Sequence, residues 1–139
     1  MVDLAGLVLE KVPLDASAIG GLTMGADGVT FITAGVAATT GRMLRAFSVR
    51  KEVKDHGAGG RIAGSLLVGD RVVITEDTVT RGTSLLEAAK VVRDFGATVV
   101  LLLAVVDRGG TAAAMARDEG FEFDALFSAL DLGFSYEGA

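Results

Sequence analysis

Short apolar runs alternate along this chain with segments in which apolar residues recur at helical spacing. The runs have the length and composition of strands and cover residues 18–20, 46–49, 72–75, 98–106 and 123–129. The run at 98–106 is almost entirely apolar, which is typical of a central parallel strand buried on both faces. The segments between the runs have the apolar spacing of helices and cover residues 4–11, 25–40, 85–95 and 111–119.

This alternation predicts an α/β fold, a doubly wound parallel sheet with helices on both of its faces. In the small-residue helix at 25–40, we expect Ile32 and Val36 to face the core. Residues 62–67 are expected to form a short connector. We find no repeat, low-complexity tract or linker, so we expect one domain over residues 1–139.

Composition agrees with a compact domain and excludes several classes of site. The chain has 139 residues, of which 50% are hydrophobic and 22% are charged, enough for a proper core. It has no cysteine and one histidine, which excludes disulfides and thiolate metal sites and disfavours a histidine zinc site. We find no secretory segment and no apolar run of membrane-spanning length, so a cytoplasmic protein is expected.

Charge is unevenly distributed along the chain. The net charge of −5 argues against general nucleic-acid binding. Residues 42–71, in contrast, contain seven basic and three acidic side chains, a local charge of +4. A cationic segment in an acidic protein favours a small polyanionic substrate over an extended phosphate backbone.

The densest candidate chemistry follows the apolar run at 72–75. Glu76 and Asp77 come directly after it, and residues 80–84 form a Thr/Gly-rich turn that opens the next helix. We expect the two acids to leave the sheet at the carboxyl end of a strand, where open α/β sheets bind ligands. Backbone N–H groups at a helix N-terminus favour a phosphate, and paired carboxylates accept hydrogen bonds from a vicinal diol. The order predicts a site for a ribose 5-phosphate.

Two other interpretations use the same residues. The acids could lie in a solvated turn, with Thr80 or Thr83 capping the helix and no ligand present. Gly20, Gly21 and Gly25 also stand between a strand and a helix, as in dinucleotide-binding proteins, but their spacing does not match G-x-G-x-x-G.

Three segments resemble known motifs, in the order in which one family has them. ITEDTVTRGTS (residues 74–84) resembles the phosphoribosyl-diphosphate (PRPP) motif of type I phosphoribosyltransferases, with Thr75 in place of a fourth hydrophobic residue. RKEVKDHGAGG (residues 50–60) resembles the mobile catalytic loop of orotate phosphoribosyltransferases, and GGLTMGAD (residues 20–27) the loop that receives pyrophosphate. The resemblance runs from about Leu4 to Leu132 and implies the Rossmann-like, type I phosphoribosyltransferase fold.

The resemblance also implies a reaction. Orotate phosphoribosyltransferases transfer ribose 5-phosphate from PRPP to orotate, which gives orotidine 5'-phosphate and pyrophosphate in de novo pyrimidine (UMP) biosynthesis. Bond breaking at the anomeric carbon gives an oxocarbenium-like transition state, so catalysis is mostly a matter of charge placement. Mg²⁺ would be held by pyrophosphate and ribose oxygens and not by an all-protein cage.

Residue roles carry over from the matching motifs. Lys54, Asp55 and His56 are the implied catalytic residues, with Lys54 contributing most to the chemical step. Arg50, Lys51, Lys54 and His56 would meet the pyrophosphate, while Glu76 and Asp77 would hold the ribose hydroxyls. The remaining PRPP-binding residues are Thr78, Val79, Thr80, Arg81, Gly82, Thr83 and Ser84. Without the resemblance, the basic stretch would be read as a solvated charge run.

Arg108 is the implied contact for the base, together with Thr80. It lies in DRGG (residues 107–110) after the strand at 98–106, and a guanidinium matches the carboxylate of orotate in bidentate geometry. The simpler interpretation is an exposed turn in which Asp107 pairs with Arg108 or a neighbour.

One departure concerns the start of the chain. Family members begin with a helix and a Ser-Gly-x-x-Ser-x-x-Tyr segment that closes over the base and joins the dimer, and this sequence starts beyond it. The alternatives to full activity are a shortened, non-catalytic PRPP-binding relative and a phosphoribosyltransferase for another base. The resemblance further implies a homodimer whose loop serves the neighbouring active site, with no nucleic-acid or membrane partner.

Overall fold

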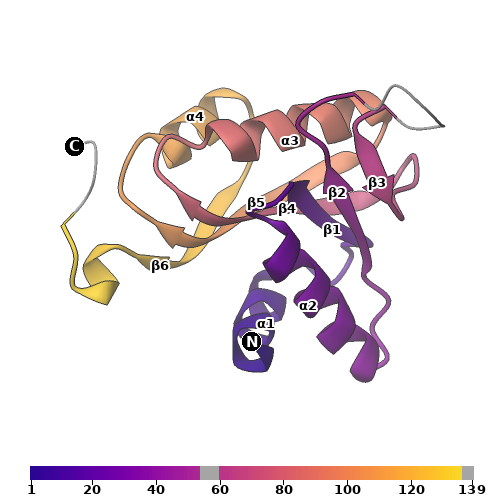
Figure 1. Ribbon diagram of the computed structural model, residues 1–139, viewed down its shortest axis with the longest axis horizontal. Coiled ribbons are helices and arrows are strands. Elements are labelled where there is room, and N and C mark those ends of the chain that lie inside the picture. The colour runs from indigo at the N-terminus through magenta and orange to yellow at the C-terminus, as the bar shows by residue number, and fades with distance from the viewer. Residues whose placement is uncertain (54–59, 136–139) are drawn as a thin grey trace.

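A computed structural model describes residues 1–53 and 60–135 and consists of a six-stranded sheet with helices on both faces (Figure 1). The elements in chain order are α1 (Val2–Lys11), β1 (Ala18–Leu22), α2 (Asp27–Thr39), β2 (Arg45–Val49), β3 (Ile62–Gly64), β4 (Arg71–Val79), α3 (Thr83–Phe95), β5 (Thr98–Asp107), α4 (Ala112–Asp118), β6 (Phe123–Ser128) and the 3-10 helix η1 (Leu130–Leu132). In the ranges that the structure describes, no helix is long and apolar enough to cross a membrane.

The sheet confirms the predicted doubly wound architecture, with one exception at its edge. Its strand order is β3-β2-β1-β4-β5-β6, and every pairing is parallel except that of β3 with β2. The prediction of a connector at residues 62–67 was therefore wrong for residues 62–64, which pair antiparallel with β2. Three residues are too few to show a periodicity, so only the return of the chain to β2 reveals this strand.

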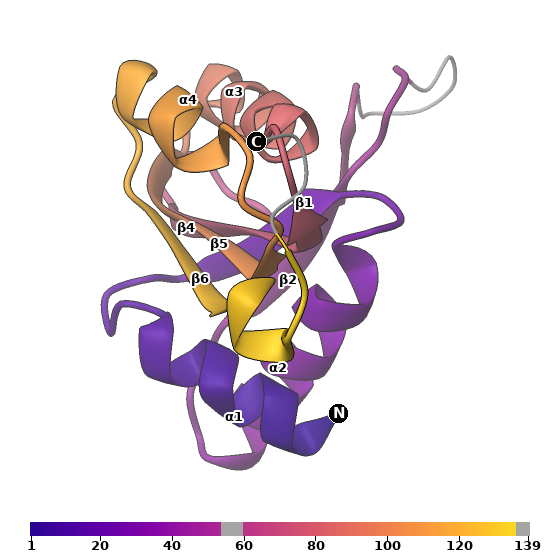
Figure 2. The same cartoon turned by 90° about the vertical axis from the view of Figure 1, so that its left-hand side faces the viewer.

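Helices cover both faces of the sheet, α3 and α4 on one side and α1 and α2 on the other (Figures 1 and 2). Successive residues of β4 supply both cores: Val72 and Ile74 pack in the cluster that contains α3, and Val73 packs in the cluster that contains α1 and α2. Because both faces are buried, the central strands carry unbroken apolar runs in place of an alternation.

The rotation of α2 differs from the prediction. Val29, Thr30, Thr33 and Ala37 are its buried residues, whereas Ile32 and Val36 are only half-buried. The hydroxyls of Thr30 and Thr75 lie 3.0 Å apart in a buried hydrogen bond between α2 and β4. Small and apolar residues occur around the whole of this helix, so its sequence pattern does not determine which side packs on the sheet.

A buried carboxylate holds the amino ends of the strands together. Asp70, directly before β4, accepts hydrogen bonds from Ser17 Oγ (2.9 Å), the Leu67 backbone N–H (2.8 Å) and Arg45 Nη1 (3.0 Å). Burial works to raise the pKa of Asp70, but the bonds from Arg45, Leu67 and Ser17 outweigh it and hold the pKa below its usual value. This cluster lies at the end of the sheet opposite the carboxyl ends of the strands.

Candidate functional site

The carboxyl half of β4 carries both predicted acids. β1 pairs with β4 only as far as Ile74, whereas β5 continues alongside β4 to Asp107. The prediction that Glu76 and Asp77 leave the sheet was therefore wrong, because both lie within β4. They do lie beyond the last residue of β4 that pairs with β1, in a stretch where the strand has only β5 beside it. β1 and β4 therefore stop pairing just before the two acids, at the carboxyl ends of the strands, where open α/β sheets bind ligands.

Glu76 is buried, with 6% of its surface exposed, and it approaches the turn after β1 closely. A Cβ on Gly25 would overlap Glu76 Oε1 and lie 3.2 Å from Asp77 Oδ1, so a larger residue here would displace these carboxylates. Burial raises the pKa of Glu76 to about 7; the Asp77 carboxylate adds to the rise, while the Asp77 backbone N–H and the charge of Lys51 oppose it. Glu76 therefore changes its protonation state near neutral pH.

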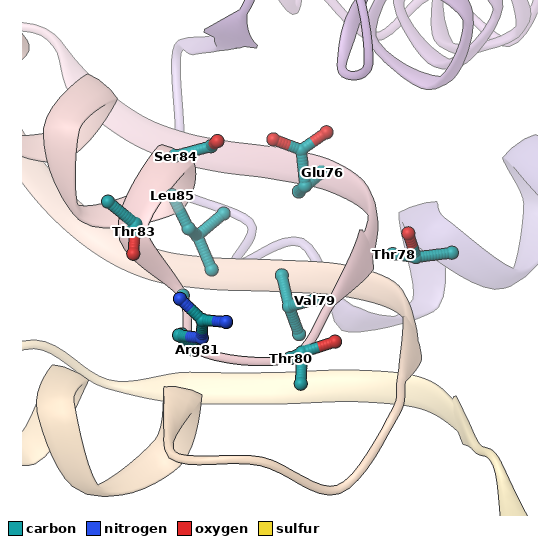
Figure 3. Close-up of a pocket in the computed structure, with 9 residues that line it drawn as sticks. Glu76, Thr78, Val79, Thr80, Arg81, Thr83, Ser84 and Leu85 are labelled. Atoms are coloured by element: carbon teal, nitrogen blue, oxygen red, sulfur yellow. The ribbon is translucent and has the colours of Figure 1, made fainter. Parts of the chain in front are cut away.

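The first pocket lies between the end of β4 and the start of α3 and has a volume of about 330 Å³ (Figure 3). Its lining consists of Glu76, Thr78, Val79, Thr80, Arg81, Gly82, Thr83, Ser84 and Leu85. Gly82 stands before α3 with φ of +84°, a left-handed conformation that glycine adopts without strain. Among the described residues, no side chain caps this helix, so neither Thr80 nor Thr83 is the predicted cap. The first N–H groups of α3 are thus left for a ligand.

A second pocket, of about 260 Å³, adjoins the first. It is lined by Leu22, Thr23, Met24, Gly25, Lys51, Glu76, Asp77, Thr78 and Ser84, of which Glu76, Thr78 and Ser84 also line the first pocket. The turn at residues 23–26 forms one wall, and Gly20 and Gly21 of the predicted loop belong to β1 instead. Lys51 brings a positive charge to this pocket, whereas Arg50 does not line it.

A third and mostly apolar pocket, of about 440 Å³, contains Arg108. It is lined by Thr78, Val106, Arg108, Ala129, Leu132, Phe134 and Ser135, so Thr78 is common to all three pockets. Thr80, which the resemblance also assigned to the base, lines the first pocket and not this one. Sequence reasoning missed Leu132 and Phe134, because no motif or periodicity marks the segment after β6.

The predicted site residues outside these pockets fall into two groups. Lys54, Asp55 and His56 lie outside the described residues. Arg50 lies at the end of β2, where its backbone N–H donates to Arg61 O and its Nη1 lies 3.4 Å from Ile62 O. Asp107 precedes Arg108, and its Oδ1 accepts the Gly109 backbone N–H at 2.9 Å.

Known proteins of similar sequence are orotate phosphoribosyltransferases. The enzyme of Mycobacterium tuberculosis H37Rv is 42% identical over 119 residues, 86% of this chain and 65% of that protein. The enzyme of Streptomyces avermitilis is 49% identical over 100 residues, 72% of this chain and 55% of that protein. The chain thus spans less than two thirds of the length of these relatives. No family model matches it.

Solved structures agree over nearly the whole chain. A phosphoribosyltransferase from Corynebacterium diphtheriae superimposes with a TM-score of 0.84 at 40% identity, over 96% of this chain and 77% of that chain. Orotate phosphoribosyltransferase of M. tuberculosis H37Rv, in complex with Fe(III) dicitrate, gives 0.85 at 39% identity, over 96% and 75%. This chain belongs to the orotate phosphoribosyltransferase family. The same mycobacterial protein has also been solved with PRPP bound, with a TM-score of 0.81 and 36% identity to this chain.

Proposed function

We propose that this chain transfers ribose 5-phosphate from PRPP to orotate, with release of pyrophosphate, in de novo pyrimidine biosynthesis. The observation that carries the proposal is the meeting of three pockets at Thr78. The two substrates together present a 5-phosphate, a pyrophosphate and a planar base around one ribose. The first pocket, which is polar and lies at a helix start, suits the 5-phosphate. The second, which contains a lysine, suits the pyrophosphate, and the third, which is largely apolar and contains an arginine, suits the base.

The 5-phosphate and the ribose take the positions around β4 and α3. The N–H groups at the start of α3 and the hydroxyls of Thr80, Thr83 and Ser84 line the first pocket and suit a phosphate. Glu76 lines both of the first two pockets and Asp77 lines the second, and both accept hydrogen bonds from the ribose 2- and 3-hydroxyls. With its pKa of about 7, Glu76 also donates such a bond in its protonated form.

Pyrophosphate gains negative charge as it leaves, and the second pocket receives it. Lys51 lies there, and Arg50, Lys54 and His56 are the further residues that the resemblance assigns to this task. The carboxylates of Glu76 and Asp77 face the open side of Gly25 and are hard oxygen ligands of the type that Mg²⁺ prefers. In the described ranges, no three acidic, histidine or cysteine side chains are grouped as a metal cage, so Mg²⁺ would share substrate oxygens. The ion would neutralise charge on the leaving group.

Orotate occupies the third pocket. Arg108 faces its carboxylate, and Val106, Leu132 and Phe134 supply apolar contact for the planar ring. This assignment brings the base nitrogen toward Thr78, where all three pockets meet.

The experiment that tests the reaction follows the loss of orotate absorbance when the chain is mixed with PRPP and Mg²⁺. We expect turnover in the wild type, its near abolition in Lys54→Ala, and a tenfold or larger rise in the KM for orotate in Arg108→Lys with the KM for PRPP within threefold. Arg117→Lys on α4 is the matched control and leaves both constants unchanged. Binding of PRPP without turnover would instead identify a non-catalytic relative, and turnover with another base would identify a different phosphoribosyltransferase.

We also propose a homodimer in which Arg50, Lys54 and His56 serve the neighbouring active site, while Lys51 lines the second pocket of its own chain. Arg50 supports this, because its backbone and side chain bond to the start of the β3 segment and it lines none of the three pockets of its own chain. Sedimentation should show a dimer at micromolar concentration. In a mixture of Lys54→Ala and Arg108→Ala chains, the mixed dimer contains one intact site, so activity should return; a mixture that stays inactive would contradict shared sites.

A further inference from the structure

Asp27, the first residue of α2, receives hydrogen bonds from two separate segments of the chain. Thr23 Oγ1 in the turn after β1 donates to Asp27 Oδ2 at 2.7 Å, and Ser48 Oγ in β2 donates to Asp27 Oδ1 at 2.9 Å. Each carboxylate oxygen is thus occupied by a hydroxyl, and bonds to a charged acceptor are stronger than neutral ones. The carboxylate also lies in the first turn of a 13-residue helix, where the helix dipole stabilises negative charge.

Asp27 does not line the second pocket. A negative charge near a pocket for a polyanion weakens binding through electrostatic repulsion. Direct contact with the ligand therefore does not explain why a carboxylate is present at position 27. Its partners do line or lead to that pocket: Thr23 forms part of the wall, and Ser48 is followed, three residues later, by Lys51. Asp27 therefore touches the pocket only through other residues.

The turn at residues 23–26 is held by Asp27 against β2. The Thr23 N–H donates to Val49 O at 2.9 Å, and the Asp27 N–H donates to Met24 O at 3.1 Å. On the other side of the turn, Gly25 faces Glu76 and Asp77 without room for even a Cβ. A small displacement of the turn would therefore change the width of the pocket between Lys51 and the two acids.

We propose that Asp27 is a positioning residue, which joins the 23–26 turn to the end of β2 and so sets the shape of the pocket that receives pyrophosphate. This inference rests on the proposed function, since it assigns the pocket to the pyrophosphate group. The hydrogen bonds from Thr23 and Ser48 to the Asp27 carboxylate make this connection.

The test compares Asp27→Asn, Asp27→Ala and Ser48→Ala with Thr40→Val. Thr40 Oγ1 bonds to Ala37 O at 2.9 Å beyond the other end of α2, so Thr40→Val removes a hydroxyl bond far from the pocket. We expect Asp27→Ala to raise the KM for PRPP and the inhibition constant of pyrophosphate about tenfold, with kcat and the KM for orotate within about threefold. Asp27→Asn, which keeps one acceptor, should recover part of the loss, and Thr40→Val should show none.

A double-mutant cycle adds a readout that a general loss of stability would not reproduce. Ser48→Ala in the Asp27→Ala background should add little to the rise in KM, because the bond between the two residues is already gone. Additive effects, or a lower Tm with an unchanged KM for PRPP, would overturn the proposal.

Calorimetric binding of PRPP separates this inference from the reaction. If the wild type binds PRPP without turnover and Asp27→Asn binds it more weakly, the proposed activity fails and the positioning role stands. If the wild type turns over and the Asp27 variants bind PRPP equally well, the positioning role fails and the activity stands. A wild type that binds no PRPP refutes both.

Discussion

Glu76→Gln tests the burial of the charge at the centre of the site. In the folded chain the pKa of Glu76 is raised to about 7 from 4.5, chiefly by burial. A raised pKa means that the protonated form is favoured by folding. The contribution of Glu76 to stability is therefore fully present below pH 4.5 and is lost as the pH rises through 7.

The size of this effect follows from the shift. At about 1.4 kcal/mol per pKa unit, the loss between the two pKa values is up to about 3 kcal/mol. Glutamine has nearly the same shape and no charge, so the free energy of unfolding of Glu76→Gln should rise relative to the wild type by most of that amount between pH 5 and pH 8. For a chain of this size, about 3 kcal/mol corresponds to roughly 10 °C in Tm.

The assay is urea unfolding of the ligand-free wild type and variant at several pH values, with Glu119→Gln as an exposed control. Any fixed offset between glutamine and glutamate cancels, because only the pH dependence of the difference is read. Asp77→Asn should reduce this pH dependence, since the Asp77 carboxylate contributes to the raised pKa. A difference between Glu76→Gln and the wild type that stays constant from pH 5 to pH 8 would refute the reasoning.

Three further predictions concern backbone fit and the cluster at the far end of the sheet. Gly25→Ala should leave the Tm within a few degrees but reduce kcat/KM for PRPP at least tenfold in steady-state assays, because the new methyl group overlaps the Glu76 carboxylate. Gly82→Ala should destabilise the chain by about 1 kcal/mol or more in urea unfolding, because φ is +84° there and the Cβ would lie 3.0 Å from Ala112. Gly28→Ala is the control, because a Cβ there would have nothing within 4 Å. Asp70→Asn should cost about 2–3 kcal/mol at pH 7, because Arg45 loses its buried partner. Since the pKa of Asp70 is lowered, that cost should shrink as the pH falls below the usual value of 3.8, and a cost that is equal at pH 3 and pH 7 would contradict the assigned charge.

Local sequence patterns predicted most of the elements, including the Thr/Gly-rich turn that opens α3. The apolar runs at 72–75 and 98–106 are unbroken because parallel strands are buried on both faces. An unbroken run can be recognised in the sequence without knowing which strands lie beside it. The Thr/Gly turn before α3 is likewise a local signal, since its residues are consecutive in the sequence, whereas the lack of a side-chain cap was seen only in the structure.

Tertiary structure decided what depends on neighbouring segments. β4 continues through Glu76 because β5 pairs with it, and β3 exists because β2 is there to receive it. The predicted rotation of α2, with Ile32 and Val36 toward the core, was wrong because apolar residues surround the helix, and packing on the sheet selected the face with Val29 and Ala37.

The site shows the same division. The resemblance to the PRPP motif could be recognised from the sequence because residues 74–84 are consecutive. The pKa of Glu76, the meeting of three pockets at Thr78 and the bonds of Asp27 to Thr23 and Ser48 arise from segments distant in the chain. Burial and hydrogen bonding between such segments exist only after folding, so no pattern along the chain encodes them directly.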